Sequence, residues 1–248
     1  MEHSFGPAEE SLSPRLRQNL TKINELLAKS PDLIIRRFMI QVNHQSWEAA
    51  IIFIDGLVDT KVIENHILRP LMVDGFKMKS DGPGIFGSNV RKDFGWIENH
   101  LLTVNSLVHQ STFDEVLNAI LSRDTVLLAE GIAEGFQISS KGWEHRSIEE
   151  PDTEVTIKGA REGFIESLRT NTALLRRKVG HPHLTFEGMQ VGRKSKTNLS
   201  LAYIRGLTDE DLLKEVRRRI SRIDTESILD AVFWNSTLRT PLYHCFPL

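Results

Sequence analysis

The sequence predicts a mixed α/β fold, with two small α/β subdomains packed together and preceded by an N-terminal helix. Apolar residues recur at helical spacing in some segments and in short strand-like runs in others, with turn residues between them. A charged, proline-bearing stretch divides the 248 residues into two parts. Because 40% of the residues are hydrophobic and 26% are charged, we expect an ordinary globular core and exclude global disorder.

Residues 1–30 are predicted to form an arm that ends in one helix. Leu16, Leu20 and Ile23 repeat at helical spacing, and Ser30-Pro31 ends the pattern. We expect this helix to pack on the body of the protein.

Residues 31–148 are predicted to form the first α/β subdomain. The apolar runs 32–42 and 49–54 are typical of strands. An Asp-Gly turn leads from the second run into a helix that Pro70 is expected to end, with His66 on its apolar face.

The same subdomain is predicted to contain a second helix and a hairpin. Thr112 and Glu115 have the spacing of a capping box, in which each side chain binds a backbone N–H group that the helix leaves unpaired. Strands are expected at 125–129 and 136–139, joined through glycines. Residues 74–95, which contain five glycines, are expected to be a loop.

Residues 149–230 are predicted to form the second α/β subdomain, and 231–248 a tail of unclear role. Its elements in chain order are a long helix, strands at 185–191 and 198–204, and a closing helix. Phe164 and Leu168 are expected to face inward from the first of these helices. Thr208 is expected to cap the closing helix, with Leu212 on its core face.

The net charge of −2 conceals an asymmetry between the two parts of the chain. Residues 1–150 contain 15 Lys and Arg against 21 Asp and Glu, whereas 151–248 contain 16 against 12. Opposite signs indicate two units that meet each other, or a basic face turned to a partner. The imbalance is too small to predict a nucleic-acid partner.

Candidate catalytic and metal-binding residues are few. Asp55 follows an apolar strand and could serve as a nucleophile or magnesium ligand, although Asp-Gly is ordinary turn chemistry. His181 and His183 lack a third ligand at a recognisable spacing. Cys245 is the single cysteine, which excludes an internal disulfide. We therefore expect no enzyme activity, no bound metal and no cofactor.

Candidate interface or coupling residues surround the expected boundary between the subdomains. They are Glu150, Asp152, Glu154, Arg161, Glu162, Asn171, Arg176 and Arg177. Arginine forms bidentate pairs with carboxylates, so a charged interface is one interpretation. A solvated helix face is the other, because exposed ion pairs contribute little to stability. For Arg217–Arg219 we favour helix-dipole complementarity over binding to anionic lipid or nucleic acid.

Four ordered blocks of the sequence resemble the A subunit of spore germination receptors, the GerA family. The blocks are 54–59, 67–72, 150–154 with 161–174, and 192–197 with 201–204. The resemblance runs from about Asp32 to Leu229, and from about Ala231 onward it is expected to end.

The resemblance implies a large soluble N-terminal domain on the cytoplasmic side of the spore inner membrane, without the multi-helix membrane domain that follows it in the family. It implies a transporter-like B subunit, a lipoprotein C subunit and other A subunits as partners, with nutrient recognition assigned to the B subunit. The implied function is receptor assembly and signal transmission during spore germination. The alternative is a module that closes over a small molecule or ion between two subdomains.

Overall fold

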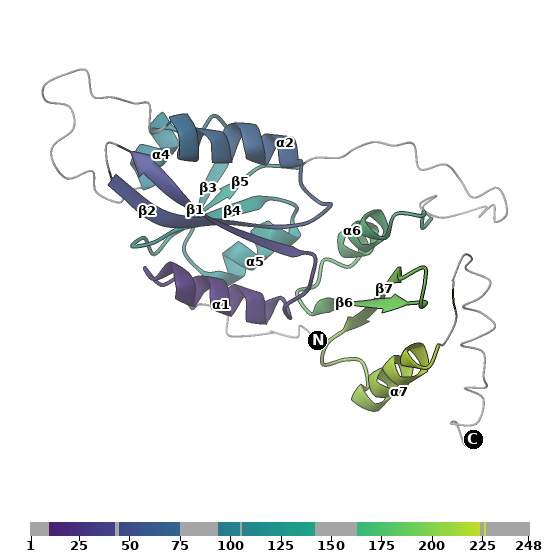
Figure 1. The fold of residues 1–248 in the computed structure, drawn as a ribbon. Coiled ribbons are helices and arrows are strands. Elements are labelled where there is room, and N and C mark those ends of the chain that lie inside the picture. Colours follow the sequence, from purple (N-terminus) through teal and green to yellow (C-terminus); the bar gives the residue numbers. More distant parts are fainter. Residues whose placement is uncertain are drawn as a thin grey trace, which may run out of the picture. The chain divides into compact units, whose positions relative to one another are not determined.

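The computed structural model describes residues 10–42, 45–74, 94–104, 106–141, 163–223 and 226 (Figure 1). The chain forms two compact units, residues 1–182 and 183–248. Helices accompany an antiparallel sheet in each unit, so the predicted mixed class is confirmed.

A five-stranded antiparallel sheet is the centre of the first unit, with the strand order β1-β2-β4-β5-β3. Its strands are β1 (Leu33–Val42), β2 (Gln45–Ile54), β3 (Leu107–Gln110), β4 (Thr125–Ala129) and β5 (Gly135–Ile138). The predicted strands β1, β2, β4 and β5 are confirmed, whereas β3 was not predicted.

Both faces of this sheet are buried, which explains the nearly continuous apolar sequence of β2. Ala49, Ile51 and Phe53 belong to the core on one face, whereas Ala50 and Ile52 belong to the core on the other. Helices cover both faces, with α2 and α4 above the sheet in Figure 1 and α1 and α5 below it. The helices are α1 (Leu16–Leu26), α2 (Thr60–Val62), α4 (Phe94–His100), α5 (Phe113–Leu121) and α6 (Leu168–Lys178).

The helix that begins as α2 does not end at Pro70, contrary to the prediction. It continues in wide π-type turns as η1 (Ile63–Leu68) and η2 (Pro70–Asp74). Proline clashes with the carbonyl four residues earlier in an α-helix, and a π-type turn changes that spacing. His66 is exposed rather than on the apolar face, and its Nδ1 lies 2.9 Å from the Thr103 hydroxyl.

The capping box at the start of α5 is confirmed. The backbone N–H of Glu115 donates to the Thr112 hydroxyl at 3.3 Å, and the Glu115 carboxylate accepts from the Thr112 backbone N–H at 3.0 Å. The cap depends only on residues three positions apart, so the sequence was sufficient to find it.

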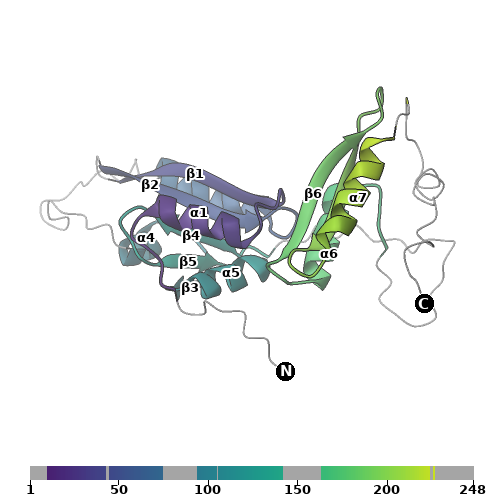
Figure 2. The ribbon, with the colours of Figure 1, turned by 90° about the horizontal axis from the view of Figure 1, so that it is seen from below.

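The second unit is a hairpin with one helix along it (Figure 2). Its elements are β6 (Leu184–Val191), β7 (Thr197–Ile204) and α7 (Glu210–Ser221). Val191 and Ile220 are buried between the hairpin and α7. The cap of α7 is Asp209 rather than the predicted Thr208, because its carboxylate accepts from the N–H groups of the second and third residues after it. Leu212, expected on the core face, is 46% exposed.

The two compact units divide after Pro182, whereas the sequence pattern predicts that 149–182 belong to the second subdomain. The reason is α6, whose Ala173 belongs to the core of the first unit. Phe164 and Leu168 do not face inward as predicted, being 67% and 39% exposed. The loop expected at 74–95 is helical at its ends, because Asp74 belongs to η2 and Phe94 and Gly95 belong to α4. Its remainder at 75–93, the chain around the predicted boundary at 149, and the tail at 231–248 lie outside the described residues.

His109 on β3 lies between two carboxylates of the first unit. Its Nε2 is 3.2 Å from the Glu98 carboxylate on α4, and its Nδ1 is 3.3 Å from that of Glu134, which precedes β5. Partial burial lowers the pKa of His109, but hydrogen bonds to Glu134 and Glu98 outweigh it, so the pKa lies above its ordinary value of 6.5. The protonated ring therefore stabilises the folded state.

We expect the stability difference between the wild type and H109Q to be larger at pH 6 than at pH 9. A raised pKa means that the His109 contribution is complete below the ordinary value and is lost as the pH rises through the raised value. Urea unfolding at both pH values measures it, with E98Q/E134Q as a background in which the pH dependence should disappear. An equal difference at both pH values would contradict the role of the two carboxylates.

Candidate functional site

Two aspartates lie together at the open end of the β1–β2 hairpin. Asp32 precedes β1 and Asp55 follows β2, and the strands pair so that Leu33 is opposite Ile54. The backbone N–H of Asp55 donates to the carbonyl of Asp32 at 2.8 Å. Antiparallel pairing therefore places the two carboxylates side by side at the same end of the hairpin.

Helix α6 turns one face toward these aspartates. Arg169, Ala173 and Arg176 share this face because they are four and seven residues apart. Arg169 donates from Nε and Nη2 to the two Asp55 carboxylate oxygens at 2.8 and 2.7 Å. Arg176 does the same to Asp32 at 2.9 and 3.0 Å. We call the set Asp32, Asp55, Gly56, Arg169, Ala173 and Arg176 the α6 clamp.

The two ion pairs of the α6 clamp differ in their exposure to water. The Arg176 side chain is 0% exposed and that of Asp32 9%, and Arg176 also donates to the Ser30 hydroxyl at 3.1 Å. The Arg169 and Asp55 side chains are 57% and 34% exposed. Breaking a buried pair leaves an unpaired charge in the interior, whereas breaking an exposed pair costs little.

Gly56 lets α6 approach the turn after β2. Its φ is +80°, in the left-handed region that favours glycine. A Cβ atom at this position would lie 2.9 Å from the Cβ of Ala173, closer than two carbon atoms pack. A side chain at Gly56 would therefore push the helix away.

The geometry around Asp55 favours a structural role over the catalytic alternative. Both of its carboxylate oxygens accept hydrogen bonds from Arg169. The rule that ligands bind at the carboxyl ends of strands applies to open parallel sheets, whereas this sheet is antiparallel. Among the described residues, no cluster of three or more His, Cys, Asp or Glu could hold a metal ion.

The structure describes three of the eight predicted interface residues. Arg176 is in the α6 clamp, and Arg177 is half-buried on α6. The Asn171 amide donates to the carbonyl of Ile165 at 2.6 Å and accepts from its N–H at 2.8 Å, which holds the segment before the helix. The remaining five, which lie outside the described residues, are Glu150, Asp152, Glu154, Arg161 and Glu162.

Sequence reasoning missed the α6 clamp as a unit. Its partners are separated by more than a hundred positions, so no local pattern links them. The available signal was the pair of arginines seven residues apart with the small Ala173 between them.

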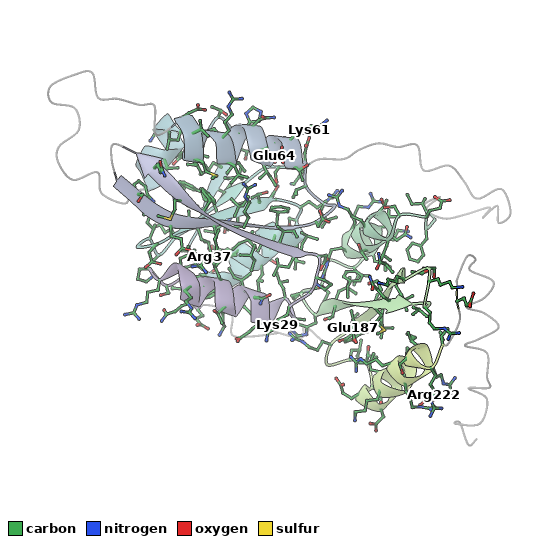
Figure 3. All side chains as sticks on the ribbon, viewed as in Figure 1. Lys29, Arg37, Lys61, Glu64, Glu187 and Arg222 are labelled. Carbon is green, nitrogen blue, oxygen red and sulfur yellow. The ribbon has the colours of Figure 1, made fainter. Side chains whose placement is uncertain are left out.

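The arginine run of α7 is paired within the second unit. Arg217 binds both oxygens of Glu187, which is labelled on β6 in Figure 3, at 2.8 and 3.0 Å. Arg218 and Arg219 both donate to Glu215, and these hydrogen bonds lower the pKa of Glu215 to about 2. Besides complementing the helix dipole, the run therefore forms ion pairs with its own unit.

A hollow of about 390 Å³ opens between β6 and α7. Its lining residues are Met189, Gln190, Val191, Gly192, Arg193, Arg217, Ile220, Ser221 and Ile223. It is therefore an apolar depression with arginines on its wall. Throughout the described part of the chain, no helix has the length and apolar character needed to cross a membrane.

Comparison with known proteins gives consistent matches. A family model described as Bacillus/Clostridium GerA spore germination protein matches residues 21–248. The expectation that the resemblance ends near Ala231 is therefore wrong. Spore germination protein KA of Bacillus subtilis (strain 168) is 31% identical over 95% of this chain and 41% of its own length. Stage V sporulation protein AF of the same organism is 35% identical over 73% of this chain and 34% of its own.

A solved structure has the same fold. The N-terminal domain of the A subunit of the Bacillus megaterium spore germinant receptor GerK3 matches with a TM-score of 0.69 and 29% identity. The match covers 92% of this chain and 78% of that one. The chain thus corresponds to most of that domain, and it spans about two fifths of the length of the KA protein.

We expect R176A to lower the free energy of unfolding by about 3–5 kcal/mol, because it leaves the Asp32 carboxylate buried without its charged partner. R169A should cost less than about 1 kcal/mol, because its pair is exposed. Urea unfolding of the purified chain, followed by circular dichroism, measures both. Similar small losses in the two variants would show that burial does not distinguish the pairs.

We expect G56A and A173G to be coupled in a double-mutant cycle. G56A introduces the close contact with Ala173 and an unfavourable backbone conformation. A173G removes the contact but not the conformation, and by itself it weakens α6 because it places a glycine inside the helix. The double variant should therefore lose less stability than the two single variants together. Agreement with additivity within about 0.5 kcal/mol would contradict close packing at this position.

Proposed function

The chain belongs to the GerA family of spore germination proteins, and from that premise we propose that it is the N-terminal domain of a germinant receptor A subunit that acts in receptor assembly and signal transmission. The likeness to the corresponding domain of the GerK3 receptor carries this proposal, because it extends over 92% of the chain. We further propose that the domain acts without catalysis.

The proposed partners are the B and C subunits of the receptor and other A subunits. The proposed location of the whole protein is the spore inner membrane, with this domain on the cytoplasmic side. A supporting observation is that the chain is 31% identical to a Bacillus subtilis protein described as the uncharacterized membrane protein YfkQ, over 44% of that protein's length. The candidate residues from Glu150 to Glu162 remain proposed contacts between subdomains or subunits.

The α6 clamp supports a role in transmission. It joins α6 to the open end of the β1–β2 hairpin through one buried pair and one exposed pair. The exposed pair can exchange with water or with another protein at little cost, whereas the buried pair keeps the helix in place. We propose that α6 responds to neighbouring subunits by gaining or losing the Arg169–Asp55 pair, which gives it two states of similar free energy.

Binding of a small molecule or ion between two subdomains stays a prediction. The hollow that the structure describes lies within the second unit, between β6 and α7. Its volume of about 390 Å³ is at the lower end of the range for small-molecule sites. This observation does not favour ligand binding over the transmission role.

We expect spores that carry R169A in the whole protein to germinate several-fold more slowly in response to the receptor's nutrients. The variant breaks the exposed pair and leaves the buried pair of Arg176 to maintain the fold. The optical density of a spore suspension measures the rate, and an immunoblot of the membrane fraction measures the amount of receptor.

The charge-swapped variant D55R/R169D should restore part of the rate, because it re-forms an ion pair of opposite polarity. K61A removes an exposed cation elsewhere on the first unit (Figure 3) and serves as the control. Loss of receptor from the membrane in R169A would support the assembly part of the proposal. Germination of R169A at the wild-type rate and receptor level would overturn the role of the clamp.

A further inference from the structure

The second unit has opposite charges at its two ends. The hairpin tip lies at the same end as the C-terminus of α7 (Figure 2). Residues 190–197 and 220–226 contain four cations against two carboxylates, those of Glu226 and of Asp224, which lies outside the described residues. We call Arg193, Lys194, Lys196 and Arg222 the basic end.

The opposite end of the unit is acidic. Asp209, Glu210 and Asp211 lie in the β7–α7 turn and the first turn of α7, with Arg205 and Lys214 as the neighbouring cations. Carboxylates in this position are stabilised by the positive end of the helix dipole. The opposite charges of the two ends therefore give the unit a dipole, which an electric field can orient.

The hairpin tip is a defined structure that presents its lysines to solvent. Gly192 has a φ of +92°, which allows the tight turn after β6. The backbone N–H groups of Lys194 and Ser195 donate to the carbonyl of Glu226 at 2.9 and 3.3 Å. The Lys194 side chain also pairs with the Glu226 carboxylate, yet it remains 74% exposed. The tip is thus held against the chain that follows α7.

We propose that the basic end of the second unit binds the surface of a bilayer that contains anionic lipids. Exposed lysines and arginines at one end of a unit are attracted to anionic headgroups, and each contributes roughly a five-fold increase in binding. The acidic end is repelled, so the unit is oriented with the hairpin tip toward the membrane. The presence of a membrane beside this domain rests on the proposed function.

Two observations favour a bilayer over nucleic acid. Arg217–Arg219 are paired with Glu187 and Glu215, and Lys194 is paired with Glu226, so the described cations of the unit do not form the long basic stripe typical of nucleic-acid binding. The hollow beside the tip has Met189 and Ile223, which are half-buried against the Val191–Ile220 core, on its wall together with Arg193. Apolar surface next to cations suits the boundary between headgroups and acyl chains.

Vesicle flotation of the purified chain tests the proposal. The probes are vesicles of phosphatidylcholine alone and of phosphatidylcholine with 30% phosphatidylglycerol, as a chosen composition, at low and high salt. We expect binding only to the anionic vesicles, with strong weakening at high salt. K194Q/K196Q should bind about ten-fold or more weakly than the wild type.

R205Q/K214Q is the matched control, because it removes the same number of cations from the other end of the same unit. It should bind as the wild type does. Equal binding to both kinds of vesicle, equal losses in the two variants, or tighter binding to a short DNA duplex than to anionic vesicles would overturn the proposal. Flotation uses no spores, so its failure would leave the receptor proposal standing, and a failure of the germination experiment would leave this result unaffected.

Discussion

The first unit depends on one buried ion pair, between Arg176 of α6 and Asp32 at the start of β1. The guanidinium also reaches the Ser30 hydroxyl at 3.1 Å and the His181 carbonyl at 3.4 Å. A charge inside a protein is tolerated only when such partners replace its lost water. The same group therefore joins the α1–β1 turn, the β1–β2 hairpin and α6.

The contrast between the two Arg–Asp pairs gives the clamp a division of roles. Both have the same bidentate geometry, so chemistry does not separate them. Their exposure to solvent separates them, because water competes for the charged groups of an exposed pair but does not reach those of a buried pair. Ala173 and Gly56 between them fix the distance of the helix from the sheet. Loss of the exposed pair would therefore leave the buried pair, and with it the position of α6, in place.

The sequence predicted the features that depend on residues close together along the chain, and it missed those that depend on distant partners. The capping box of Thr112 and Glu115 and the main strands follow from local patterns, and the structure confirms them. Thr208 and Asp209 are adjacent and both are good caps, so the sequence could not choose between them. The buried face of α6 was misassigned, because the apolar Phe164 and Leu168 outweighed an arginine whose distant partner was not visible in the sequence.

The covalent continuity of α6 with the sheet has a thermodynamic consequence for this helix. Because both belong to one chain, docking is an intramolecular event governed by an effective concentration and not by the concentration of the protein. A partner protein that competes for Asp32 or Asp55 must overcome that local excess. Displacement of α6 therefore selects for competitors that are themselves tethered nearby, such as neighbours in one assembly, over molecules that diffuse freely.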